Sequence, residues 1–204
     1  MTRLRRHRPG VVLTRLNTAL LILVVATASA VAGLWWRARP SAAPPPPPGP
    51  QWQWIVVHHS AGPEGNAAVF DQWHRQRGWD ELGYHFVIGN GHGSGDGQVE
   101  VGPRWAQQRA GAHCHTPSDR FNRHGIGVCL VGDFSKAGAH PTPAQRAALV
   151  DLCVARCRDQ SIPPDHILGH RDAQTTEGRS TTECPGSLDI AGLRKEVAAR
   201  LAAR

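Results

Sequence analysis

The sequence predicts an α/β fold, a single domain in which a central β-sheet is flanked by helices. Short apolar runs rich in β-branched residues alternate along the chain with segments of helical periodicity. Strands interspersed with helices form sheets that helices cover on both faces. The chain has 204 residues and no internal repeat, which suffices for one ordinary domain with short appendages. We therefore expect one hydrophobic core, within residues 52–204.

Four strands are predicted in this domain. Residues 54–58 form a short, apolar, β-branched run typical of a buried strand. Residues 84–88 and 126–131 form two more, and the second is almost wholly apolar and therefore expected to be central. The glycine-rich segment 89–97 between them lacks the pattern of a phosphate-binding loop, so we interpret it as a hairpin connection. Residues 166–169 form the fourth strand.

The clearest helix begins at Thr142. Pro143 occupies the first helical position, and Gln145 completes a Thr-x-x-Gln capping box. These signals fix the start of the helix more firmly than its end. Its inward face is expected to consist of small and apolar side chains, namely Ala147, Val150, Cys153, Val154 and Cys157.

Two further helices are predicted from the spacing of apolar residues. Residues 66–77 form one of them, and residues 189–203 form the last helix of the chain. The residues at helical spacing are Val69, Trp73 and Gln76 in the first, and Leu193, Val197 and Leu201 in the second.

The first 50 residues differ in charge from the rest of the chain. They contain seven of the 23 basic residues and no acidic one, whereas the rest holds 16 basic against 16 acidic residues. The net charge of +7 therefore belongs to the N-terminal segment. A protein that binds a polyanion needs a basic face on its folded part. We expect no nucleic-acid partner.

Residues 19–36 form an uncharged stretch just long enough to cross a membrane. Five arginines lie before it in residues 1–18, and only Arg37 and Arg39 follow closely, so the positive-inside bias predicts a cytoplasmic N-terminus. We interpret residues 19–36 as a single-pass transmembrane signal anchor in the cytoplasmic membrane. The alternative is a cleaved signal peptide, because residues 28–30 are Ala-Ser-Ala. Both interpretations place the domain outside, on the periplasmic or cell-wall side.

Residues 37–51 form a proline-rich linker. Five successive prolines, residues 44–48, hold the chain in the extended polyproline II conformation, at about 3.1 Å per residue. This composition predicts a stalk between the membrane and the domain.

Five cysteines in an exported protein ordinarily predict disulfides, but an odd number leaves at least one for another role. Cys153 and Cys157, four residues apart on a helix, are interpreted as buried small apolar side chains. Cys114 and Cys129 form a candidate pair whose connectivity one sequence does not decide. Cys184 differs from these four because it lies in a polar, turn-rich stretch.

A thiolate and imidazoles that converge from strand ends and loops form a good zinc site, because three protein ligands leave the fourth position to water. With twelve histidines in the chain, residue types alone do not identify the ligands. The candidates are also spread over more than half the chain, so they form no self-contained motif.

Six sequence blocks occur in order between residues 54 and 203. They are Ile55-Val56-Val57-His58-His59-Ser60-Ala61, Gly83-Tyr84-His85-Phe86, Gly111-Ala112-His113, Gly125-Ile126-Gly127-Val128-Cys129-Leu130-Val131-Gly132, Gly169-His170-Arg171-Asp172 and Glu183-Cys184-Pro185-Gly186. Together they resemble the type-2 N-acetylmuramoyl-L-alanine amidases, which include phage lysozyme amidases and animal peptidoglycan recognition proteins. The resemblance implies a central mixed sheet and a zinc cofactor. It also implies hydrolysis of the amide bond between N-acetylmuramic acid and L-alanine in peptidoglycan.

Position by position, the resemblance implies that His58, His170 and Cys184 are the zinc ligands and that His59 is not. Successive side chains of a strand point to opposite faces, so His58 and His59 cannot both reach one ion. This argument does not say which of them does, because Val56 and Val57 make both faces apolar.

The resemblance also implies roles beside the metal. Tyr84 matches the catalytic tyrosine of the family, and Thr182 lies where phage enzymes carry a lysine and many catalytic recognition proteins a threonine. We expect the two hydroxyl groups to bind the developing oxyanion or to orient the water. His113 and Asn122 are expected to bind substrate. The loop between the second and third ligands, residues 171–183, is longer than in the shorter relatives.

Two other hypotheses remain open. A non-catalytic peptidoglycan-binding receptor or scaffold would have the same fold, but such family members typically lose the cysteine ligand, which is present here. A disulfide-stapled exported domain would require Cys184 to be oxidised. We expect the protein to be a monomer, and the sequence leaves the general base unassigned.

Overall fold

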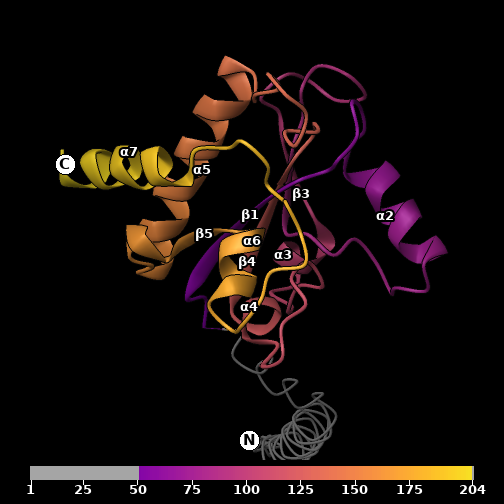
Figure 1. The fold of residues 1–204 in the computed structure, drawn as a ribbon, viewed down its shortest axis with the longest axis horizontal. Coiled ribbons are helices and arrows are strands. Elements are labelled where there is room, and N and C mark those ends of the chain that lie inside the picture. Colours follow the sequence, from indigo (N-terminus) through magenta and orange to yellow (C-terminus); the bar gives the residue numbers. More distant parts are fainter. Residues whose placement is uncertain (1–50, 204) are drawn as a thin grey trace, which may run out of the picture. The chain divides into compact units, whose positions relative to one another are not determined.

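The computed structural model describes residues 51–203 (Figure 1). The predictions for residues 1–18, 19–36 and 37–50 therefore lie outside the described residues. Among the residues that are described, none of the helices combines the length and the apolar character that crossing a membrane requires.

The described residues contain a five-stranded mixed sheet, which confirms the predicted α/β class. Its order is β3-β2-β4-β1-β5, and all neighbouring strands run parallel except β2 and β3, which are antiparallel. The antiparallel pair confirms the hairpin connection predicted for residues 89–97. The strands are β1 (Trp54–His59), β2 (Phe86–Ile88), β3 (Val99–Val101), β4 (Gly125–Leu130) and β5 (Ile167–Gly169).

Helices cover both faces of this sheet, as the alternation of elements predicts. Buried side chains of α5 and α7 pack on one face, and those of α2, α4 and α6 pack on the other. Figure 1 shows α5 and α7 lying together. The helices are α2 (Ala67–Gln76), α3 (Pro103–Ala106), α4 (Arg120–Arg123), α5 (Pro143–Gln160), α6 (His170–Thr175) and α7 (Ile190–Ala202), with a 3₁₀ turn η1 (Pro164–His166) before β5.

The capping box predicted for α5 is present, with Thr142 as the N-cap. The predicted inward face needs one correction, because Ala147 is exposed. The inward face also includes a polar side chain that the apolar pattern does not reveal. The buried residues of α5 are Gln145, Leu149, Val150, Cys153, Val154 and Cys157.

Helix α2 lies within the predicted residues 66–77, and of the residues at helical spacing Val69 packs against the core. Phe70 and His74 are buried, whereas Trp73 is 44% exposed. The burial of His74 is stabilised by a tertiary contact, since its Nδ1 accepts a hydrogen bond of 2.9 Å from the backbone N–H of Gly83. Spacing of apolar residues cannot indicate such a contact.

All five cysteines are free thiols and buried. Cys153 and Cys157 pack in the core between the sheet and α5, as predicted. Cys114 and Cys129 lie in two separate clusters on the other side of the sheet, so the candidate disulfide between them does not form.

Candidate metal centre

The two adjacent histidines of β1 point to opposite faces of the sheet. The His59 ring packs against Phe134 on the side of α5, and its Nδ1 accepts a hydrogen bond of 2.9 Å from the N–H of that residue. His58 lies on the other side, next to Tyr84 and His113, and is 1% exposed. The structure therefore answers the question that alternation alone leaves open, and places His58 at the candidate site.

Three of the predicted site residues converge beyond the carboxyl ends of β1 and β5. His58 lies near the end of β1, His170 follows β5 directly and opens α6, and Cys184 lies in the segment between α6 and α7. The Nδ1 of His58 is 3.8 Å from the Sγ of Cys184, and one donor atom from each of the three residues lies within 4.8 Å of the others. The three predicted ligands thus come together in space.

The donor set and its spacing fit a zinc ion. Zinc–nitrogen bonds of about 2.0–2.1 Å and zinc–sulfur bonds of about 2.3 Å imply roughly 3.6 Å between a nitrogen and a sulfur ligand in a tetrahedral site. The Nε2 atom of His170 is buried and has no hydrogen-bond partner among the described residues. A buried polar atom without a partner is unfavourable unless another group, such as an ion or water, binds it. Three protein ligands leave a fourth position open, as in catalytic zinc sites.

Burial sets the protonation states of the three side chains. It lowers the pKa of His58 well below its ordinary value and that of His170 to about 4, so both rings are neutral at pH 7, as metal ligation requires. It also raises the pKa of the Cys184 thiol to about 11, and the N–H of His59, 3.3 Å from Sγ, opposes this rise. Because a cysteine binds metal as the thiolate, binding would release the thiol proton.

Two hydroxyl groups adjoin the cluster. The half-buried Tyr84 ring lies 5.2 Å from the His58 ring, measured between centroids. Burial, followed by the neighbouring thiols of Cys129 and Cys184, raises the pKa of Tyr84 well above its ordinary value, so its hydroxyl remains a hydrogen donor. The Oγ1 of Thr182 accepts a hydrogen bond of 3.1 Å from the N–H of Cys184, which leaves the hydroxyl hydrogen of Thr182 available.

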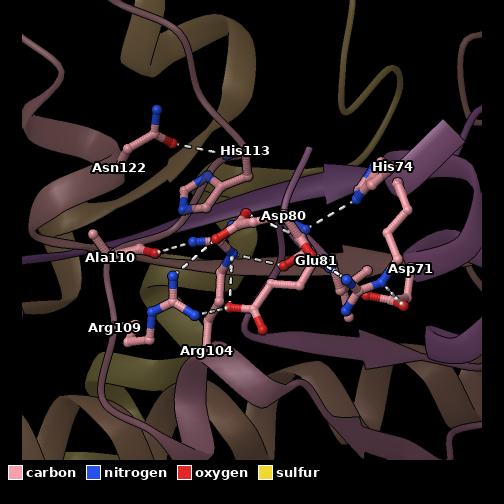
Figure 2. A network of polar contacts seen from close by, with 12 residues as sticks. Asp71, His74, Asp80, Glu81, Arg104, Arg109, Ala110, His113 and Asn122 are labelled. Carbon is pink, nitrogen blue, oxygen red and sulfur yellow. Dashed lines mark hydrogen bonds and ion pairs between the residues drawn. The ribbon is translucent and has the colours of Figure 1, made fainter. Parts of the chain in front are cut away.

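A buried arginine holds the segment that carries Tyr84 (Figure 2). Arg104 is 5% exposed, and its Nε and Nη1 atoms donate to the carbonyl oxygens of Leu82 and Ala110, both at 2.7 Å. Its remaining nitrogen pairs with Asp80. Arg109 pairs with Asp80 and with Glu81, each at 2.8 Å. Sequence reasoning missed this network, since its members are ordinary charged residues until the fold brings them together.

The two residues predicted to bind substrate make their hydrogen bonds within the protein. His113 is 7% exposed, and both of its ring nitrogens have protein partners. The Oδ1 of Asn122 accepts from the N–H of His113 at 2.8 Å (Figure 2) and from the N–H of Cys114 at 2.8 Å, while its Nδ2 donates to Asp119. The observed contacts of Asn122 are therefore structural, and its role toward substrate stays a prediction.

The long loop between the second and third candidate ligands packs against residues 115–120. The Gln174 side chain donates to the carbonyl oxygen of His115 at 3.2 Å, and Glu177 accepts from Ser118 and pairs with Arg120. A cavity of about 240 Å³ lies between the loop and this segment, close along the chain to Cys184. It is lined by His115, Thr116, Pro117, Gln174, Glu177, Arg179 and Thr181.

The chain is similar in sequence to proteins of phages and animals. It is 41% identical over 106 residues to the endolysin of Escherichia phage T7, a match that covers 49% of this chain and 63% of that protein. It is 32% identical over 133 residues to peptidoglycan recognition protein 1 of Bos taurus, which covers 61% of this chain and 64% of that protein. The chain thus spans about three fifths of the length of these curated relatives.

Solved structures and a family profile agree with this similarity. The N-acetylmuramoyl-L-alanine amidase LysC from Clostridium intestinale URNW matches with a TM-score of 0.57 and 27% identity, over 74% of this chain and 86% of that one. Wild-type Drosophila PGRP-LB matches with a TM-score of 0.51 and 26% identity, over 72% and 81% of the two chains. The profile of the N-acetylmuramoyl-L-alanine amidases matches residues 48–187, and the chain belongs to this family.

Proposed function

We propose that this protein is a zinc-dependent hydrolase of the amide bond between N-acetylmuramic acid and L-alanine in peptidoglycan. The observation that carries the proposal is the convergence of His58, His170 and Cys184. Membership of the amidase family supports the choice of this bond. The presence of Cys184 favours an enzyme over a non-catalytic receptor, since a receptor has no need of a complete metal site.

When bound, zinc supplies a Lewis acid that polarises a carbonyl group and lowers the pKa of a water molecule to about 7. His58, His170 and Cys184 would hold the ion and would leave one coordination position for water or substrate. Tyr84 donates a hydrogen bond from its hydroxyl group to the carbonyl oxygen of the substrate as negative charge develops there. The hydroxyl group of Thr182, in the loop that carries Cys184, donates a hydrogen bond to the same oxygen or orients the water. Neither hydroxyl accepts a proton readily at neutral pH, so the general base is a different group.

Digestion of purified peptidoglycan by the purified protein, followed by mass spectrometry, tests this proposal. We expect stem peptides that begin with a free L-alanine amino group, no release after zinc is chelated, and recovery when zinc is restored. Cys184→Ala should be inactive, whereas Cys157→Ala, on the opposite side of the sheet, should remain active. Turnover that survives both chelation and Cys184→Ala would exclude the metal mechanism, and binding without release would favour the receptor.

We propose in addition that residues 19–36 anchor the chain in the cytoplasmic membrane as a monomer, with the domain outside. The uncharged stretch and the arginines before it support this location. After expression of the full chain in bacteria, an anchored protein should stay with the membrane fraction through a carbonate wash. A soluble, shortened form would show instead that the segment is a cleaved signal peptide.

A further inference from the structure

We propose that His113 is a positioning residue for the metal centre. Its hydrogen bond to the Nε2 atom of His58 fixes the orientation and the tautomer of that ring, so that the Nδ1 lone pair of His58 faces the other two ligands. The inference depends on the proposed metal site but not on the identity of the substrate. It replaces the substrate-binding role expected for His113 from the sequence.

Three contacts in a row define the tautomers. The Nε2 of His113 lies 3.2 Å from the carbonyl oxygen of Gly125, the Nδ1 of His113 lies 3.1 Å from the Nε2 of His58, and the Nδ1 of His58 lies 3.8 Å from the Sγ of Cys184. A carbonyl oxygen only accepts hydrogen bonds, so the Nε2 of His113 is the donor. In a neutral imidazole the other nitrogen is then an acceptor.

The donor in the second contact must therefore be the Nε2–H of His58. Its Nδ1 then carries the lone pair that a metal ion needs, on the side of Cys184. Burial lowers the pKa of both rings well below the ordinary value, which agrees with neutral imidazoles. Metal-bound histidines usually donate their second N–H to an oxygen acceptor. Here the acceptor is a nitrogen of a second histidine, His113. The hydrogen bond from His113 to a backbone carbonyl oxygen determines which of its two nitrogens accepts.

The fold holds the His113 ring rigidly. A Cβ atom on Gly127 would lie 2.3 Å from the Cδ2 of His113, and one on Gly111 would lie 2.4 Å from the same atom. Any larger residue at either position would displace the ring. The side chain of Asn122 accepts a hydrogen bond from the backbone N–H of His113 and fixes this part of the chain. A ring packed in this way loses little freedom when it orients a metal ligand, which is the condition for a preorganised site.

A pair of substitutions separates this role from simple packing. In His113→Asn, the carboxamide oxygen can accept from the Nε2–H of His58 near the position of the lost Nδ1, whereas His113→Leu fills similar space with no acceptor. Competition with a chromophoric chelator would measure the zinc affinity of each purified protein. We expect His113→Leu to bind zinc about 10- to 100-fold more weakly. His113→Asn should retain most of the affinity, and His115→Leu, at an exposed histidine two residues away, all of it.

Wild-type zinc affinity in His113→Leu would overturn the proposal. If, in addition to this unchanged zinc affinity, the KM of the variant for muropeptides rose, His113 would be a substrate-binding residue. Because zinc affinity is measured without substrate, failure of the proposed amidase activity would leave this result unaffected.

A second measurement needs no substitution. Two-bond ¹H–¹⁵N correlation spectra of the metal-free wild-type protein distinguish the two tautomers of each histidine. The expected result is a hydrogen on Nε2 in both His58 and His113. A hydrogen on the Nδ1 of His58 would contradict the proposal.

Discussion

Tyr84 places its ring 5.2 Å from that of His58, at the edge of the candidate metal centre. Its raised pKa keeps the hydroxyl protonated, so the group can donate a hydrogen bond but not accept a proton. We predict that Tyr84→Phe lowers kcat by about 10²- to 10³-fold, because one donor to the oxyanion is removed. Zinc content should be unchanged. Steady-state kinetics with metal analysis would check this, and a variant with full activity would show that the hydroxyl has no catalytic role.

His85 is fully buried, and its protonation makes the stability of the fold depend on pH. Its Nε2 donates to the carbonyl oxygen of Arg109 at 3.0 Å, and its Nδ1 accepts from the N–H of Gly127 at 2.9 Å. Burial lowers the pKa of His85 to about 4. Because the folded pKa lies below the unfolded value of about 6.5, protons favour the unfolded chain. The contribution of neutral His85 to the free energy of unfolding is complete above about pH 6.5, and roughly 3 kcal/mol of it is lost as the pH falls to about 4.

Urea unfolding of the metal-free protein at pH 7 and at pH 4.5 would measure this loss. Other buried histidines add to the total, so the matched comparison is His85→Gln, which lacks the titrating group. The unfolding free energy of His85→Gln should fall less between the two pH values than that of the wild type. Equal decreases would show that His85 is not a source of acid sensitivity.

Single residues differ in how much of their role the sequence reveals. Strand alternation predicts that only one of His58 and His59 reaches an ion, and the choice needs the packed neighbours of each ring. The role of His113 is harder to predict from the sequence. Its partner is the backbone carbonyl of Gly125, and no residue type or spacing identifies a backbone partner.

Helix α5 joins two strands through the buried side chain of Gln145. The Oε1 of Gln145 accepts from the N–H of Thr142 in the capping box, at 3.2 Å. Its Nε2 donates to the carbonyl oxygens of Ile88 and Val131, at 3.1 and 2.9 Å. The sequence predicts the first of these contacts, because a capping box is local. The bonds to the ends of β2 and β4 depend on the fold.

Substitution of Gln145 by Glu separates the two functions. Glutamate is also a capping-box residue, so the local contact is kept, but the carboxylate cannot donate to the two carbonyl groups. We predict that Gln145→Glu lowers the unfolding free energy by about 2–3 kcal/mol. Thr142→Ala, which removes the cap and an exposed hydrogen bond from the Thr142 hydroxyl to Asp96, should lower it by about 1 kcal/mol. If urea unfolding at pH 7 gave a smaller loss for Gln145→Glu than for Thr142→Ala, the bonds to the strands would contribute little.

The elements that the sequence predicts are those with local signals. The capping box fixes the start of α5, and regular apolar spacing predicts the last helix at residues 189–203, where α7 lies. The elements that it misses are short and lack periodicity. The three residues of β3 are at the sheet edge with mostly exposed side chains, and α6 has six residues and begins at the candidate ligand His170.

The arrangement of the whole sheet creates the candidate site. Parallel pairing of β1 with β5 sets Val57 opposite Gly169, so the residues that follow, His58 and His170, emerge at the same edge. Ligands of α/β proteins commonly bind outside the carboxyl ends of parallel strands. Strand order cannot be read from separate apolar runs. The sequence therefore supplies three candidate ligands through family resemblance, whereas their proximity follows only from the topology.

Because the three candidate ligands come from distant parts of the chain, a bound ion would connect β1, α6 and the segment before α7 only in the folded state. An ion that binds the folded protein alone stabilises it by about 2.7 kcal/mol at a free concentration 100 times its Kd. For a domain of this size, that corresponds to a rise in Tm of roughly 5–10 °C.

We predict that chelation lowers the Tm of the wild type by this amount and leaves the Tm of Cys184→Ala unchanged. Cys157→Ala should start from a lower Tm, because it opens a small cavity in the core, but should respond to chelation as the wild type does. A Tm that does not depend on zinc in the wild type, or that still depends on it in Cys184→Ala, would show that the ion does not link these three segments.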